Sequence, residues 1–280
     1  MQEFTSVDEA DVTKAIVSEY LKELESLTDT DAVVVGSGPA GSVCARKLAE
    51  KGHKVLIVER NIKPGGGMFL GGMLMNKLVV EAPADRICRE VGAKSLKEYK
   101  PGLFVGDAHE IATKLIAAAF DAGAHMLNAV QVEDIIYREQ GICGVVINWH
   151  MVSSYPDWVT CTDPLALKTK VVIDATGHAA EVARLAGKRF GFEVKGHEGA
   201  MWVDEAEKAT YNATQEIYPG LIVCGMAANG VYMLPRMGPI FGAMFMSGEK
   251  AAELAHQRIL ELGSNQATPL KPREPLIQHR

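Results

Sequence analysis

The chain has 280 residues, of which 48% are hydrophobic, so it can bury one large α/β core or two small ones. Its formal net charge of -6 argues against nucleic acid as a partner, because such proteins carry a basic footprint. The polar, acidic start and the lack of a long apolar run predict no signal peptide and no membrane span, and we expect a cytoplasmic protein.

The first third of the chain predicts a βαβ unit behind a helical arm. Apolar residues at helical spacing predict an amphipathic helix over 8–27, within an N-terminal arm at residues 1–30. The unit that follows has a strand at 32–35, a helix over about 40–51 and a strand at 54–59. The composition of the next segment, PGGGMFLGGMLM at 64–75, favours a flexible loop or the start of a helix.

The remainder predicts alternating helices and strands without a clean linker. The expected elements are a helix over 107–122, strands at 126–137 and 141–149, an irregular loop at 152–163, strands at 170–175 and 221–224, and a Gly-, Met- and Pro-rich segment at 231–246 that leads into a helix ending near 262. We therefore expect one dinucleotide-binding domain over 31–262. The polar tail at 263–280 contains three prolines and is expected to be disordered.

The stretch DAVVVGSGPAG contains a G-x-G-x-x-G motif between an apolar strand and a helix. Gly36 would allow the tight turn, Gly38 would let the backbone approach a pyrophosphate, and Gly41 would let helix and strand pack closely. Glu59 stands at the end of the next strand, where an acid accepts hydrogen bonds from a ribose hydroxyl. We predict that an adenine dinucleotide binds here.

The late part of the chain argues against a flavin as that dinucleotide. The motif, the following Val-Glu-Arg and a late Ala-Thr-Gly strand end are similar to those of two-dinucleotide-binding flavoproteins. Such proteins place an acid after a late glycine to hold the ribityl chain. Here the pair is Gly225 and Met226, although another residue could substitute for the acid.

Three residues near the middle of the chain could carry chemistry. Asp163 lies in an irregular loop, and His178 follows a strand end, where α/β sheets place ligands. A carboxylate and an imidazole suit a divalent metal such as iron or zinc, but the sequence around His178 taken alone favours an ordinary turn residue. Cys161 stands in the same loop as Asp163, and a single loop cysteine is more often inert than reactive.

Arg236 is the one charged residue in the apolar stretch LPRMGPIFG. Its planar guanidinium suits a carboxylate or phosphate ligand. A structural salt bridge is the alternative.

Together these motifs resemble the thiamine thiazole synthases. The matches are GSGPAG, the Glu-Arg pair at 59–60, GGGM at 65–68, the Cys-x-Asp-Pro loop, DATGH, the Gly-Met pair and LPRMGP, all in the family's order over roughly residues 15–260. The resemblance implies an α/β fold of the two-dinucleotide-binding, glutathione-reductase-like Rossmann type, with a parallel central sheet and an additional β-sheet. It also implies a homo-octamer.

In that family NAD is a substrate and not a redox carrier. Nicotinamide is lost, the ADP-ribose isomerises to an ADP-ribulose species, and this condenses with glycine. Sulfur addition and cyclisation then give an ADP-linked thiazole carboxylate for thiamine biosynthesis, assisted by Fe(II). The resemblance therefore implies a transferase that consumes NAD and glycine.

The resemblance also assigns residue roles. Asp163 and His178 match metal ligands that come from adjacent subunits, and both count as catalytic together with Cys161. Arg236 matches the residue that holds the glycine carboxylate. The nucleotide-binding positions are Gly36, Gly38, Ala40, Gly41, Glu59, Arg60, Gly67, Val132, Thr162 and Met226.

The sulfur source depends on position 161. One branch of the family has histidine there and uses free sulfide over many turnovers. The other has cysteine, which donates its own sulfur and becomes dehydroalanine, so that the enzyme works once. Cys161 predicts the second mode. The eukaryotic cysteine-type enzymes, however, carry a histidine shortly before this cysteine, and SSYPDWVT at 153–160 has none.

Three alternatives stay open on the sequence alone. The same ring chemistry could use free sulfide. The chain could be a flavin-dependent oxidoreductase, or a non-catalytic NAD-binding or stress-response protein in which Asp163 and His178 hold no metal.

Overall fold

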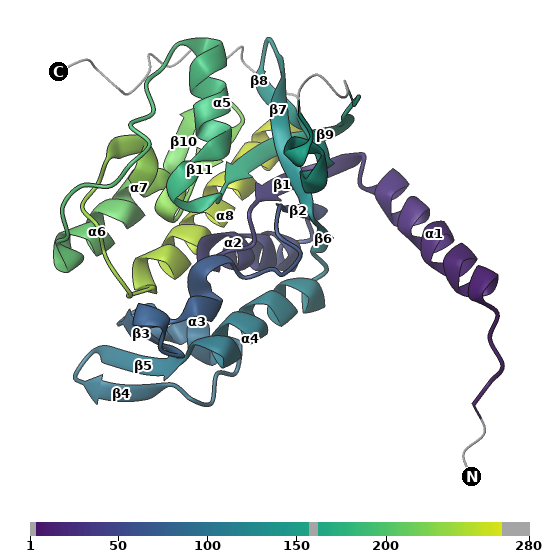
Figure 1. Ribbon diagram of the computed structural model, residues 1–280. Helices are drawn as coiled ribbons and strands as arrows, with labels where there is room; N and C mark the ends of the chain where they lie inside the picture. Colours follow the sequence, from purple (N-terminus) through teal and green to yellow (C-terminus); the bar gives the residue numbers. More distant parts are fainter. Residues whose placement is uncertain (1–3, 157–161, 265–280) are drawn as a thin grey trace.

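The glycine motif joins β1 (Asp29–Val35) to α2 (Pro39–Glu50), which leads back to β2 (Val55–Glu59). Figure 1 shows this unit at the centre of the computed structural model, which describes residues 4–156 and 162–264. β1 and β2 pair in parallel, and β2 is buried along its whole length. Buried apolar strands of this kind are typical of parallel sheets covered on both faces. The predicted βαβ unit is confirmed.

The central sheet is mainly parallel, as the resemblance implies. Its main path runs β10-β11-β9-β1-β2-β6, with β7 and β8 attached to β9 as an antiparallel hairpin. The strands not yet given bounds are β6 (His125–Asn128), β7 (Val130–Arg138), β8 (Gly141–Trp149), β9 (Leu165–Asp174), β10 (Gln215–Tyr218) and β11 (Leu221–Val223). Only the β10–β11 pair on the main path is antiparallel.

Two strand predictions need correction. The single strand expected at 126–137 is two strands, because Ala129 has a left-handed φ of +57° and redirects the chain from β2 toward β8. The strand expected at 170–175 begins earlier, at Leu165. Leu167 and Thr169 are buried there while Lys168 and Lys170 are exposed, which is the alternation of a strand with one face in solvent.

A second sheet is antiparallel and lies apart from the first. It consists of β3 (Lys77–Glu81), β5 (Leu103–Asp107) and β4 (Lys97–Lys100), in the order β3-β5-β4. This is the additional sheet that the resemblance implies, although no local pattern had located it. Its outer strand β4 is exposed at all four residues, so the periodicity of a half-buried strand is missing.

Helices cover the central sheet and form the main core. α8 (Gly242–Gly263) packs on α2, and α4 (Ala108–Asp121) packs on the other flank of α2 (Figure 1). α8 begins inside the Gly-, Met- and Pro-rich segment at 231–246, which we expected to lead into this helix. The remaining helices of the body are α3 (Asp85–Glu90), α5 (Glu181–Phe190), α6 (Val203–Ala213) and α7 (Met226–Tyr232), and short 3-10 turns lie at 66–70, 72–74, 150–154 and 177–179.

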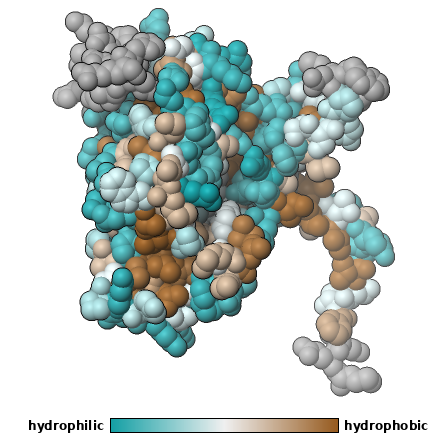
Figure 2. All heavy atoms as spheres, turned by 60° about the vertical axis from the view of Figure 1, so that its left-hand side comes forward, coloured by the Kyte–Doolittle hydropathy of each residue, from teal (hydrophilic) through white to brown (hydrophobic). Residues whose placement is uncertain are grey.

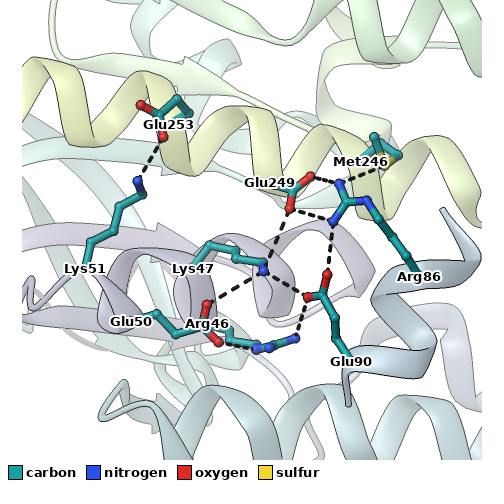
Figure 3. Close-up of polar contacts among 9 residues, drawn as sticks. All are labelled: Arg46, Lys47, Glu50, Lys51, Arg86, Glu90, Met246, Glu249 and Glu253. Atoms are coloured by element: carbon teal, nitrogen blue, oxygen red, sulfur yellow. Dashed lines mark hydrogen bonds and ion pairs between the residues drawn. The ribbon is translucent and has the colours of Figure 1, made fainter. Parts of the chain in front are cut away.

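Charged side chains also connect α2, α3 and α8 at the surface. Arg86 of α3 contacts both Glu90 and Glu249, and Lys47 of α2 donates to Glu90 at 2.9 Å (Figure 3). Lys51 reaches Glu253 at 3.0 Å farther along α8. Such a network fixes the relative register of the three helices better than isolated surface pairs do.

A pair of buried carboxyl groups lies at the start of α8. Glu207 of α6 accepts a hydrogen bond from the backbone N–H of Ala243 at 2.6 Å and lies next to Glu81 of β3. Burial, with the Glu81 contact second, raises the pKa of Glu207 to about 9. A pKa of about 9 keeps the Glu207 carboxyl group protonated at neutral pH.

The N-terminal arm carries α1 (Glu9–Ser26), which projects from the body (Figure 1). Asp8 caps it by accepting from two backbone N–H groups, and none of its residues is buried. Hydrophobic side chains run along this arm in Figure 2, and Ile16 and Leu21 are more than half exposed. The predicted amphipathic helix is confirmed, and its apolar face is uncovered in the single chain. Within residues 4–156 and 162–264, no helix combines the length and apolarity needed to cross a membrane.

Candidate functional site

A pocket of about 920 Å³ lies where the carboxyl ends of the parallel strands meet. Residues that directly follow β1, β2, β9 and β11 line it. Open α/β sheets bind their ligands at this edge. Ten of the predicted site residues line this one pocket: Gly36, Gly38, Ala40, Glu59, Arg60, Gly67, Val132, His178, Met226 and Arg236.

The three motif glycines meet different surroundings. Gly36 has a φ of +100°, and a Cβ there would lie 2.5 Å from the carbonyl oxygen of Ala175. A Cβ at Gly41 would lie 2.0 Å from the carbonyl oxygen of Gly36, so Gly41 is a packing residue. A Cβ at Gly38 would meet no heavy atom within 4 Å. Gly38 caps the N-terminus of α2 and faces the pocket, where a helix dipole favours an anion.

Glu59 is the hydrogen-bonding centre of this loop. Its side chain is buried, and one carboxylate oxygen accepts from the backbone N–H of Ser37 at 2.9 Å and from the Ser37 hydroxyl at 2.5 Å. The other oxygen accepts from the backbone and side-chain N–H groups of Asn61, each at 2.8 Å. Ser37 and Asn61 were missed from the sequence, because neither position is fixed by the motif.

The second glycine-rich segment packs against the first. Gly65 donates its N–H to the hydroxyl of Ser37 at 3.0 Å, and a Cβ at Gly66 would lie 3.1 Å from Gly38 Cα. The segment expected to be a flexible loop or the start of a helix forms two short 3-10 turns. Within the second turn, Met73 and Leu74 have φ values of +56° and +58°, which are strained for residues with side chains.

The end of β9 presents His178 to the pocket. Asp174 is buried, and its carboxylate accepts from Thr176 and from the backbone N–H of Ala183, which fixes the turn into α5. Burial raises the pKa of Asp174 against the lowering effect of these bonds. The His178 side chain stays 66% exposed.

Glu198 links two predicted site residues and was itself missed. One of its carboxylate oxygens lies 3.5 Å from His178 Nε2 and 3.9 Å from Arg236 Nε. The other is buried without a hydrogen-bond partner among the described residues. The backbone of Arg236 is fixed by hydrogen bonds to Ala200 and Trp202, so its guanidinium projects freely from an anchored position. A carboxylate beside an imidazole is a common device for orienting a ligating histidine.

Asp163 is not close to this group within one chain. Asp163 and Thr162 are exposed, do not line the pocket, and precede β9, whereas His178 follows its opposite end. The ten residues of β9 span ~30 Å at about 3.3 Å per residue. No group of three or more potential metal ligands occurs in the described part of the chain. Cys161 lies outside the described residues.

The Thi4 family model matches residues 13–241. The chain belongs to the Thi4 family. It is 45% identical over 256 residues to the thiamine thiazole synthase of Aeropyrum pernix, covering 91% of this chain and 94% of that protein. It is 46% identical over 263 residues to the thiamine thiazole synthase of Methanosarcina mazei, covering 91% and 99%. These matches support a thiamine thiazole synthase role in thiamine biosynthesis.

The Thi4 fold is also shown by a solved structure. The crystal structure of Thermovibrio ammonificans THI4 matches with a TM-score of 0.87 and 36% identity, over 91% of this chain and 100% of that one. The predicted fold class is thereby confirmed. In this Thi4 chain, the position where flavoproteins carry an acid is Met226, which begins α7, is buried and lines the pocket.

Proposed function

We propose that this Thi4 chain converts NAD, glycine and a sulfur atom into an ADP-linked thiazole carboxylate, with release of nicotinamide. The observation that carries the proposal is a single pocket lined both by a phosphate-binding glycine loop and by Arg236. One end of that pocket suits an ADP group, and Arg236 suits a small carboxylate. A substrate assembled from ADP-ribose and glycine has both features.

The glycine loop and Glu59 would hold the ADP half. The open space over Gly38 and the N-terminus of α2 favour the pyrophosphate. Glu59 faces the pocket with its carboxylate already oriented by Ser37 and Asn61, so it can accept from a ribose hydroxyl without rearranging. Val132 from β7 would contact the nucleotide from the opposite wall.

Arg236 would hold the glycine carboxylate. Its guanidinium is exposed in the pocket, and the only acid within ion-pair distance in the described residues is Glu198, at 3.9 Å. That distance leaves the planar donors free for a bidentate carboxylate. Glycine would then lie next to His178, which shares Glu198 with Arg236.

Asp163 and His178 fit a ferrous site built between subunits. A carboxylate and an imidazole are suitable donors, both side chains are exposed, and they lie beyond opposite ends of β9. One chain therefore offers two separate half-sites, which neighbouring copies in a closed homo-oligomer would complete; we propose the octamer of the resemblance. Fe(II) there would supply a Lewis acid beside the pocket.

Cys161 is the proposed sulfur donor, because it stands two residues before Asp163 in the loop that a neighbouring pocket would receive. The sulfur would add to a carbonyl carbon of the ADP-ribulose–glycine adduct, whose oxygen takes up a proton, to form a new C–S bond. Removal of the Cα proton then breaks the Cβ–S bond, leaving dehydroalanine in the chain and the sulfur on the product. This addition needs the thiolate form of the cysteine.

Intact-mass analysis after anaerobic incubation with NAD, glycine and Fe(II) tests the proposal. We expect one ADP-thiazole per subunit and a chain lighter by hydrogen sulfide at Cys161, with neither in a Cys161→Ala variant. Many products per subunit with added sulfide and intact Cys161 would replace the donor assignment by the free-sulfide route. Absence of any thiazole product in both conditions contradicts the proposed reaction.

A further inference from the structure

The Glu59–Arg60 pair offers the chemistry for two different dinucleotides. An acid at the end of the second strand accepts a hydrogen bond from the ribose 2′-hydroxyl of NAD, whereas a nearby arginine can bind the 2′-phosphate of NADP. Both residues line the pocket. The sequence therefore leaves the choice between NAD and NADP open. In the structure, a third residue determines whether Arg60 is available to a 2′-phosphate.

Arg60 is already paired across the pocket. Its guanidinium contacts the carboxylate of Glu181, the first residue of α5, and both side chains line the pocket. The two elements are far apart in sequence, since Arg60 follows β2 and Glu181 follows β9. The partner is fixed in place, because the N–H of Glu181 donates to the Thr176 hydroxyl at 2.7 Å.

The charges around this corner disfavour a phosphate. Glu59 is buried and Glu181 is about one-third exposed, so the single positive charge of Arg60 is outweighed by two carboxylates. A 2′-phosphate beside Glu59 would be repelled, and Arg60 would have to leave Glu181 to compensate it. A neutral 2′-hydroxyl is not repelled by Glu59 and does not require Arg60 to leave Glu181. It can instead donate a hydrogen bond to the Glu59 carboxylate.

We infer that Glu181 is a specificity-determining residue that selects NAD over NADP by holding Arg60 away from the ribose 2′ position. The inference rests on the proposed function, since it assumes that the glycine loop binds the ADP half. It extends that function by naming the dinucleotide class the pocket rejects and the ion pair that rejects it.

Binding of NADH and NADPH to the full chain tests the inference apart from turnover. The two probes differ only by the 2′-phosphate, and their uncharged dihydronicotinamide is a poor leaving group. Wild-type protein is expected to prefer NADH. Glu181→Gln keeps the size of the side chain, removes its charge and is expected to raise the NADPH-to-NADH affinity ratio about tenfold. Glu181→Ala, which removes the hydrogen-bond acceptor as well, is expected to raise it at least as much.

Two further variants identify the source of the change. Adding Arg60→Gln to Glu181→Gln is expected to abolish the gain, because the guanidinium is what binds the phosphate. Asp134→Asn, which breaks the Arg189 ion pair on the outer part of α5, is the matched control and leaves the ratio unchanged.

The outcomes separate the two claims. An unchanged ratio in both Glu181 variants, or a gain that survives loss of Arg60, overturns the inference while leaving NADH binding and the proposed function intact. Failure of the wild-type protein to bind either probe contradicts the nucleotide site itself, and with it both claims.

Discussion

Ser37 donates its backbone N–H and its hydroxyl to the same carboxylate oxygen of Glu59, at 2.9 Å and 2.5 Å. The same hydroxyl accepts from Gly65. One serine therefore ties together the turn after β1, the end of β2 and the second glycine-rich segment. The phosphate loop is held in shape by this contact as well as by its glycines.

Ser37→Ala is expected to destabilise the protein by about 1–3 kcal/mol, because it removes a hydrogen bond to a buried carboxylate and leaves the Gly65 N–H without its acceptor. Urea unfolding measures the change, and dinucleotide affinity should fall with it. Ser153→Ala removes an exposed hydroxyl that bonds only to its own turn and serves as the control. Equal midpoints for the two variants would show that the Ser37 contact contributes little.

Gly38→Ala and Gly41→Ala should have opposite phenotypes. Gly38 has an ordinary φ of -66° and room for a methyl group, so its variant is expected to keep the wild-type Tm and to lose nucleotide affinity by about tenfold or more. Gly41→Ala would force a Cβ against the Gly36 carbonyl and lower the Tm. Thermal unfolding and NADH titration separate the two. Normal binding by a well-folded Gly38→Ala protein would mean that the pyrophosphate does not approach there.

Asp163→Ala and His178→Ala subunits should complement each other. Each variant alone is expected to be inactive. Coexpressed subunits should regain about a quarter of the shared sites, because at random a site takes an intact Asp163 from one subunit and an intact His178 from its neighbour with that frequency. Thiazole product per subunit is the readout. A mixture that stays as inactive as its parents would indicate that both ligands act within one chain.

Arg236→Lys is expected to raise the KM for glycine about tenfold with a smaller change in the KM for NAD, because lysine keeps the charge but loses the planar fork that binds a carboxylate. Arg189→Lys, in the exposed ion pair with Asp134, is the matched control. The dependence of single-turnover thiazole formation on the concentration of each substrate would measure both constants. Equal effects on the two substrates would count against a glycine site at Arg236.

Stability should fall with rising pH because of Glu207. Its pKa in the folded protein, about 9, lies above the ordinary value of 4.5, so the stabilisation is fully present below pH 4.5 and is lost as pH approaches 9. The decline is at most about 1.4 kcal/mol per pH unit. Glu207→Gln can still accept from the N–H of Ala243 and carries no titratable group, so it should flatten this decline in urea titrations, unlike Glu205→Gln on the exposed face of α6. Parallel pH profiles for the two variants would contradict a raised pKa of Glu207.

Local pattern predicted the elements around the glycine motif, because apolar runs and turn residues are enough to specify β1, α2 and β2. It missed β4, whose four residues are all exposed and show no alternation. Glu198 was out of reach for another reason: it meets His178 and Arg236 only because three distant segments converge. Val132 and Arg60 entered through the family resemblance, and both line the pocket.

The length of β9 has a consequence for assembly. If Asp163 and His178 serve different metal sites, every subunit carries two half-sites, one with the Asp163 ligand before β9 and one with the His178 ligand after it. An open row of subunits would leave one incomplete metal half-site at each end. A closed ring or a two-fold pair has as many complete sites as subunits. Closure of the oligomer would then be a condition for full catalytic capacity.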